Sequence, residues 1–301
     1  MERIENVKKF LNKEKLDGVI IFNPSNRRYL CGFTGSTGYL VVTENKNFFL
    51  VDFRYVEQAQ QECPDFETVS IKGEWDVFPF LKGQKIKNLA IEESFVSVAF
   101  ANKLNKLGDV ERLVSVDEVL KNMRMCKDAK EIAHIRRACH ITDLAFEHIL
   151  KKIDVGMTEA NIDLLLQTFM RQYPEVERMA DRFIVAAGEH GALPHGIAGE
   201  RQVKKGDFIT MDFGCNCGGY WSDVTRTVCL GSATEKQREI YEVVKSAQDK
   251  AIVAVKAGKT GTEIDRVARD IIANAGYSDY FGHGLGHSFG LDIHESPRCA
   301  P

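Results

Sequence analysis

Two aspartates are the first residues of this chain whose type and setting could do chemistry. Asp212 and Asp223 lie within the apolar or aromatic runs MDF and YWSDV, where an uncompensated carboxylate is costly. A divalent metal ion would offset this charge, and so would a nearby arginine such as Arg226. The aspartates alone therefore leave a metal site and a simple ion pair as alternatives.

Three histidines gather in the glycine-rich segment FGHGLGHSFGLDIHESPR, at residues 283, 287 and 294. The spacing of His283 and His287 would place both on one face of a helix, as in HExxH zinc sites, but the glycines disfavour a helix. We expect a strand or loop in which His283 and His287 point to the same side, with His294 reaching the same cavity after a bend. A glycine-rich loop with exposed histidines is the alternative.

A further histidine, His195 in GALPHGIAG, has the same place in an earlier part of the chain as the cluster has later, and we expect it to face the same cleft. Aspartate and histidine ligands together suit a hydrolytic site of one or two divalent metals, which lower the pKa of bound water toward ~7 and polarise a carbonyl. Neutral histidines nearby can pass protons to a leaving amine.

Composition limits the other possibilities. The chain has 301 residues, a formal charge of −3 and 44% apolar residues, which argues against a nucleic-acid binder that relies on counterion release. The charged N-terminus MERIENVKKFLNKEKL lacks the apolar core of a signal peptide, and no segment approaches the roughly 18 apolar residues of a membrane span. We therefore expect a cytoplasmic protein with no membrane or nucleic-acid partner, and free thiols at its eight cysteines, including the CxC pair Cys215 and Cys217.

The pattern of elements predicts two domains. Residues 1–120 alternate short apolar runs with amphipathic stretches, which favours a small α/β domain around a mixed sheet; GYLVVT and NFFLVD, separated by ENK, indicate a hairpin. Residues 121–301 open with long helices. The expected helix caps are Asp128 with Glu131, Thr158, Thr234 with Gln237, and Thr262. The strands expected after the first helix pair are FIVAAG, DFITMDFG and YWSDVTRTVCL, the last two forming a hairpin.

The second domain contains an internal repeat. GMTEANID at 156–163 matches GKTGTEID at 258–265 at four positions, with an offset of 102 (258 − 156), and the order of elements agrees with this match. We interpret it as a duplicated unit of helix, helix, strand and hairpin related by a pseudo-twofold axis. The first hairpin covers about 207–229, so its counterpart is expected near 309–331, beyond Pro301.

Three segments resemble the signatures of a known family. HGIAG from residue 195, MDFGCNCGGYWSDVTRT at 211–227 and GHGLGHSFGLDIHESPR at 282–298 resemble those of the Xaa-Pro peptidases, aminopeptidase P and prolidase, metallopeptidases of the pita-bread fold. NRRYLCGFTGS and VDFRY resemble the N-terminal creatinase-like domain of the same family. The resemblance implies an α/β N-terminal domain followed by an α+β pita-bread domain that lacks its last strands.

The resemblance also implies the roles of the site residues. Asp212 would hold one metal, Asp223 would bridge two and His287 would hold the other, with a bridging hydroxide attacking the bond before proline. His195, His283 and His294 would orient substrate, stabilise the oxyanion and shuttle protons. The implied activity is the aminopeptidase P reaction at the N-terminus of proline-containing peptides, with prolidase action on Xaa-Pro dipeptides as the alternative. The implied cofactors are two divalent ions, manganese before cobalt or zinc, and the implied assembly is a homodimer.

The chain departs from the family pattern in one respect. The family completes its site with two glutamates on later strands, which would fall within the hairpin placed beyond residue 301. We therefore expect the chain as written to have little peptidase activity. Two other functions stay open: a metal-free amidinohydrolase similar to creatinase, and a non-catalytic pita-bread protein that binds peptides or partners.

Overall fold

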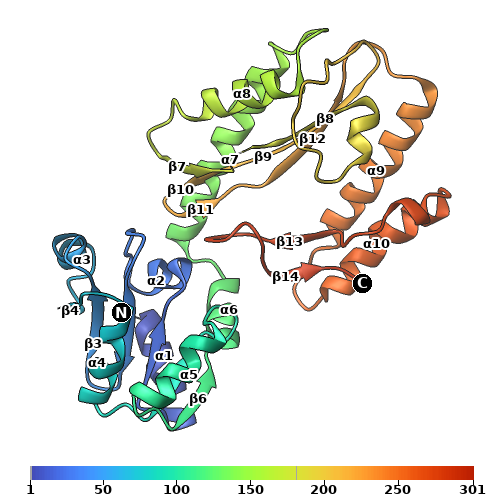
Figure 1. Cartoon of the computed structure of the whole chain (residues 1–301). Helices are drawn as coiled ribbons and strands as arrows, with labels where there is room; N and C mark the ends of the chain where they lie inside the picture. Colours follow the sequence, from blue (N-terminus) through green and yellow to red (C-terminus); the bar gives the residue numbers. More distant parts are fainter. Residues whose placement is uncertain (1, 181) are drawn as a thin grey trace. The chain divides into compact units, whose positions relative to one another are not determined.

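The computed structural model describes residues 2–180 and 182–301, which form two compact units, Met1–Cys126 and Lys127–Pro301. Each unit has its own apolar core. Figure 1 shows the path of the chain through both of them.

The first unit is built on a mixed sheet with the strand order β4-β3-β2-β1-β5-β6. Pairing is antiparallel for β1–β2 and β2–β3, and parallel for β1–β5, β3–β4 and β5–β6. The strands are β1 (Gly18–Ile21), β2 (Tyr39–Thr43), β3 (Asn47–Val51), β4 (Glu67–Ser70), β5 (Asn88–Ile91) and β6 (Arg112–Ser115). The predicted mixed sheet and the predicted hairpin of β2 and β3 are both confirmed.

Helices cover this sheet, and several of them were not predicted. They are α1 (Glu2–Glu14), α2 (Pro24–Cys31), α3 (Val56–Glu62), α4 (Val77–Gly83), α5 (Val98–Leu107) and α6 (Asp117–Met125), with a short 3-10 turn η1 (Glu74–Asp76). Helix α2 shows why some were missed, because its stretch NPSNRRYLC is short and largely polar. The available signals were its termini: Asn23 caps it, Pro24 opens it, and Gly32 closes it with a φ of 85°.

The second unit begins with the expected long helices. They are α7 (Ala129–Leu150), α8 (Glu159–Met170), α9 (Glu235–Ala254) and α10 (Gly261–Asn274). Asp128, Thr158 and Thr234 cap the first three of these, as predicted. The cap predicted at Thr262 is wrong: Thr260 forms the capping box of α10 with Glu263, while the Thr262 hydroxyl donates to the carbonyl of Ala300. Within the described part of the chain, no helix is both long and apolar enough to cross a membrane.

The strands of the second unit form small antiparallel sheets in the orders β12-β9-β8, β11-β10-β7 and β13-β14. They are β7 (Val176–Met179), β8 (Ile184–Ala187), β9 (Phe208–Phe213), β10 (Cys215–Cys217), β11 (Tyr220–Trp221), β12 (Val224–Cys229), β13 (Gly286–Ser288) and β14 (Glu295–Cys299), with 3-10 turns η2 (Gly188–Ala192) and η3 (Ser278–Tyr280). The predicted hairpin is present as β9 and β12, with β10 and β11 at its tip. Helices α7 and α8 pack on these strands, and α9 lies beside α10 (Figure 1).

The internal repeat has a physical counterpart in one hydrogen bond. Buried Asp163 on α8 accepts from the backbone N–H of Phe183, just before β8. Buried Asp265 on α10 accepts from the N–H of Leu285, just before β13. Both pairs differ by the offset of 102 found in the sequence, as do the caps Thr158 and Thr260. The same helix-to-strand attachment is therefore made twice in this unit.

Packing of α8 on the sheet can be tested with two leucines of the same helix. Leu166 is fully buried in the core of the second unit, whereas Leu164 is 62% exposed. We predict that Leu166→Ala lowers the free energy of unfolding by about 2–5 kcal/mol, because it removes buried methyl groups and leaves a cavity. Leu164→Ala should change it by less than about 0.5 kcal/mol. Urea unfolding of both variants measures this difference, and equal effects would contradict the packing described.

Candidate active site

A pocket of about 340 Å³ opens in the second unit at the ends of its strands. It brings together five of the six residues that the sequence singled out: His195, Asp212, Asp223, His287 and His294. The other lining residues are Ala180, Arg182, Phe183, Ile184, Phe213, Gly214, Trp221, Ser222, Thr225 and Ile293. The pocket thus combines acidic and imidazole groups with an apolar wall.

Strand register places the two aspartates. Asp212 lies near the end of β9 and is directly opposite Thr225 of β12, whose hydroxyl hydrogen-bonds its carboxylate. Asp223 immediately precedes β12. The hairpin therefore delivers both carboxylates to the same end of the sheet, from strands that run in opposite directions.

The charge of Asp212 is poorly compensated. Burial raises the pKa of its carboxyl group above the ordinary value, and the neighbouring charge of Asp223 raises it further, against the Thr225 hydrogen bond and the two histidines His287 and His195. In the described ranges, no lysine or arginine forms an ion pair with either aspartate. Arg226, the alternative partner, instead donates to the carbonyl of Thr225. The pocket therefore has the electrostatics of a site that favours a cation.

The ring of His287 is oriented toward these carboxylates. Its Nδ1 lies 3.0 Å from the carbonyl oxygen of Ser288, and since a carbonyl can only accept, Nδ1 must carry the proton. In the neutral ring, Nε2 then keeps a lone pair, and this atom is 3.5 Å from Oδ2 of Asp223. A backbone carbonyl bound to the distal nitrogen is the usual arrangement of a metal-binding histidine. The ring of His294 lies against that of His287, with centroids 4.4 Å apart.

Besides the Asp265–Leu285 hydrogen bond, further contacts connect the histidine segment to the rest of the unit. The backbone N–H of Trp221, at the hairpin tip, donates to the carbonyl of Gly290 at 2.8 Å. The ammonium of Lys127 lies 3.1 Å from the carboxylate of Glu295 in an ion pair that is largely shielded from solvent. A Cβ at position 290 would lie 2.8 Å from the same carboxylate, so a larger residue there would shift Glu295 away from its present position. These contacts hold His287 and His294 beside the aspartates.

The sixth predicted residue, His283, does not reach the pocket. It lies in a loop before β13, exposed, with Nδ1 near the carbonyl of Gly284 and its ring edge-on to Phe281. The expectation that His283 and His287 point to the same side assumed a continuous strand, but β13 covers only Gly286–Ser288. The structure therefore separates His283 from the other five residues.

The side chains that face one another in this pocket are of the types that bind divalent metal ions. Among residues 2–180 and 182–301, no group of three or more histidine, cysteine, aspartate or glutamate side chains is close enough to hold a metal ion. Asp212, Asp223 and His287 nevertheless offer two carboxylates without a lysine or arginine partner among these residues, and an imidazole nitrogen oriented toward Asp223, a combination suited to a divalent cation.

Sequence reasoning missed the residues of the pocket that carry no acid or imidazole group. Arg182 precedes the predicted strand FIVAAG, and Trp221 directly precedes the Ser-Asp pair. Trp221 could have been found as an aromatic residue beside a candidate ligand, while Arg182 had no distinguishing signal. Ile293, between Asp292 and His294, adds to the apolar wall.

The electrostatics of Asp212 lead to a pH prediction for metal-free protein. A raised pKa means that the folded state holds the proton on Asp212 more tightly than the unfolded chain does. The stability that this proton contributes is therefore complete below the ordinary pKa of 3.8. It is lost as the pH rises through the raised pKa of the folded state. In the presence of EDTA, Asp212→Asn should therefore be more stable than the wild type at neutral pH, with the difference vanishing below pH 3.8.

Urea unfolding at neutral pH and below pH 3.8 measures the free energy of unfolding of both proteins. The matched control is Asp270→Asn, a change at an exposed position of α10. If Asp212→Asn is the less stable protein at neutral pH, the description of an uncompensated carboxylate is wrong.

Comparison with known proteins identifies the family. Residues 133–301 match the model of metallopeptidase family M24, and residues 3–126 match the Creatinase/Prolidase N-terminal domain. The chain is 36% identical to the Xaa-Pro dipeptidase of Pyrococcus horikoshii over 99% of its own length and 84% of that protein. These matches confirm the resemblance drawn from the signature segments.

Solved structures of similar proteins support the same family assignment. The Xaa-Pro dipeptidase from Bacillus anthracis has a TM-score of 0.94 and 36% identity, covering 100% of this chain and 84% of that one. The X-Pro aminopeptidase from Thermotoga maritima has a TM-score of 0.89 and 36% identity, covering 99% and 85%. The expected fold, an α/β N-terminal domain and a pita-bread domain, is confirmed. The chain is an enzyme of metallopeptidase family M24, with a Creatinase/Prolidase N-terminal domain before its pita-bread domain.

Proposed function

We propose that this metallopeptidase hydrolyses the bond before proline in Xaa-Pro dipeptides, as a prolidase. The observation that carries the proposal is the placement of the Asp212 and Asp223 carboxylates beside Nε2 of His287 in one pocket. The sequence alone favoured aminopeptidase P, with prolidase as the alternative. The names of the relatives favour the alternative, since those from Pyrococcus horikoshii and Pyrococcus furiosus are Xaa-Pro dipeptidases.

The residues proposed to hold the divalent metal are Asp212, Asp223 and His287. Manganese is the first candidate, because carboxylate oxygens suit it, and cobalt or zinc could substitute for it. A metal bound there would activate water and polarise the scissile carbonyl. The carboxylates of Asp212 and Asp223 supply the negative charge that retains the cation. The Ser288 carbonyl keeps the His287 ring in the orientation that presents Nε2.

His195 and His294 are proposed to act on the substrate. Both line the pocket, and both are exposed to solvent, so that a bound peptide can reach their rings. A neutral imidazole can donate a proton to the nitrogen of the leaving proline or hold one at its own ring nitrogen. We leave His283 outside the proposed site, because it does not line the pocket.

The dipeptide preference is supported by the composition of the pocket wall. Among the described lining residues, Arg182 is the one side chain that is permanently positive. A dipeptide has a free carboxylate one residue after the scissile bond, which a guanidinium can bind in bidentate geometry. Trp221, Phe183 and Ile293 provide apolar surface for the proline ring.

The low peptidase activity expected of the chain as written stays a prediction, as do the other expectations from the family. A homodimer and a cytoplasmic location are part of the proposal, and sedimentation of the purified protein would test the first. The amidinohydrolase alternative predicts turnover without metal, and the binding-module alternative conflicts with membership of an enzyme family.

Arg182 provides the test of peptide length. We predict that manganese-loaded protein cleaves Ala-Pro faster than Ala-Pro-amide or Ala-Pro-Ala, and that Arg182→Ala raises the KM for Ala-Pro by roughly tenfold, the cost of one hydrogen bond to a charged group. The ratio of rates on the two substrate types is the measurement, because it does not depend on the absolute rate.

Arg178→Ala is the matched control, since Arg178 lies 5.7 Å from the ring of Trp221, a residue of the pocket wall, but does not itself line the pocket. Faster cleavage of the amide or tripeptide in the wild type would favour aminopeptidase P, and an unchanged KM in Arg182→Ala would remove Arg182 from the substrate site.

A further inference from the structure

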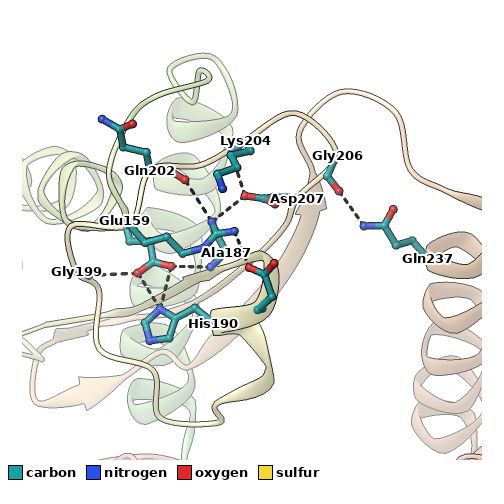
Figure 2. A network of polar contacts seen from close by, with 11 residues as sticks. Glu159, Ala187, His190, Gly199, Gln202, Lys204, Gly206, Asp207 and Gln237 are labelled. Atoms are coloured by element: carbon teal, nitrogen blue, oxygen red, sulfur yellow. Dashed lines mark hydrogen bonds and ion pairs between the residues drawn. The ribbon is translucent and has the colours of Figure 1, made fainter.

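A buried carboxylate lies outside the pocket, at the ends of the loop that carries His195. Glu159 is the first residue of α8 and has no exposed surface, and its carboxylate accepts hydrogen bonds from His190 and from the backbone N–H groups of Ala187 and Gly199 (Figure 2). The amino-terminal end of a helix stabilises negative charge. Within the described residues, His190 is the one basic side chain bound to this carboxylate.

These contacts enclose one loop. The segment 188–199 leaves β8 at Ala187, returns toward β9 at Gly199, and carries His195 between them. Glu159 receives the N–H of Ala187 at 2.8 Å and that of Gly199 at 3.3 Å, so a single carboxylate binds both ends of the loop. The N–H of Ala160 also donates to the carbonyl of Gly199 at 3.0 Å.

His190 connects this carboxylate to the residue next to His195. Its Nδ1 lies 2.8 and 2.9 Å from the two oxygens of Glu159, and because an ionised carboxylate only accepts, Nδ1 carries the proton. The other edge of the ring faces Gly196, where an added Cβ would lie 3.1 Å from Nε2 of His190. The backbone between them is closed by two turns, Leu193 N–H to His190 carbonyl and Gly196 N–H to Leu193 carbonyl, both at 3.0 Å.

Separate contacts hold the outer side of the loop. Arg201 donates to Asp207 at 2.8 Å and to Glu189 at 3.2 Å, and the Asp207 side of this network is visible in Figure 2. Glu189 is highly exposed, so its ion pair contributes little. The buried attachment through Glu159 and His190 is therefore a stronger constraint on the loop than the exposed Glu189 ion pair.

From these contacts we propose that Glu159 and His190 form a positioning pair that holds the loop 188–199 so that His195 faces the pocket. His190 does not touch the substrate; it acts through His195. This inference rests on the proposed function only in giving His195 a role in turnover, since the attachment of the loop is a property of the protein without substrate. Misplacement of a substrate-binding group by about 1 Å can cost up to a hundredfold in rate.

The first experiment measures the loop itself, without activity. Amide hydrogen exchange is followed at Ala187 and Gly199 in the wild type, His190→Ala and Glu159→Gln, with Met211 of β9 as an internal reference. The expected result is faster exchange at Gly199 in both variants with Met211 unchanged, together with broadened ring resonances of His195 in NMR spectra. Unchanged exchange at Gly199 and unchanged His195 resonances would overturn the proposal.

The second experiment separates positioning from general stability. His190→Ala should lower kcat for Ala-Pro by about ten- to a hundredfold, but it should have no further effect when combined with His195→Ala. His190→Asn, whose amide can still donate to Glu159, should recover part of the loss. If His190→Ala lowers kcat by the same factor in the wild type and in the His195→Ala variant, His190 has a merely structural role and the proposal is overturned.

His148→Ala is the matched control. His148 is a half-buried histidine of the same unit, stacked on Phe169 at 4.5 Å between α7 and α8, and it contacts neither the loop nor the pocket. This variant should leave the exchange at Gly199 and the value of kcat unchanged. If the wild type shows no turnover of Ala-Pro, even at the low rate expected of the chain as written, the proposed function fails. The exchange and NMR results still decide whether His190 holds the loop.

Discussion

The burial of the Asp212 carboxylate beside a second carboxylate, Asp223, is the constraint on which the site of this protein depends. Asp212 and Asp223 are brought to one pocket by neighbouring strands, and burial together with the second charge raises the pKa of Asp212. No arginine or lysine among the described residues pairs with either. A fold that held these groups together without a cation would lose stability. The imidazole of His287 lies beside them, with Nε2 3.5 Å from Oδ2 of Asp223.

The remainder of the second unit brings that imidazole to the aspartates. The hairpin and the histidine segment are far apart in sequence, and they meet through the Trp221–Gly290 hydrogen bond. The Lys127–Glu295 ion pair attaches the same segment to the start of α7. The repeat provides the frame for this meeting. Asp163 attaches α8 to the start of β8, and Asp265 attaches α10 to the start of β13, so each helix fixes the strand that leads to one half of the site.

The sequence predicted the parts of the structure that depend on local pattern. The mixed sheet of the first unit, the hairpin at 207–229 and the caps at Asp128 and Thr234 each have a signal within a few residues, and the structure has all of them. The cap at Thr262 failed because two threonines compete in TGT, and only Thr260 has a glutamate at the third position to complete the box. Short polar helices such as α2 failed because they lack an apolar stripe.

Those residues of the site that are acidic or are histidines could be predicted from the sequence. His195, Asp212, Asp223, His287 and His294 lie in the same pocket, because rare buried acids and clustered histidines stand out in a sequence. His283 looked equivalent to His287, but a strand of three residues does not reach it. Arg182 and the Glu159–His190 pair were not found, because their significance depends on which loops the fold places next to one another, and no local pattern encodes that.

The most direct test of the central claim, that Asp212, Asp223 and His287 form a divalent metal site, is the binding of manganese to the purified chain. Electron paramagnetic resonance of free and bound Mn²⁺ measures it in the wild type, Asp223→Asn and the control Asp270→Asn. The account predicts that the wild type and the control bind manganese equally and that Asp223→Asn loses most of the affinity. Equal binding by Asp223→Asn and the wild type, or no binding by the wild type, would contradict it.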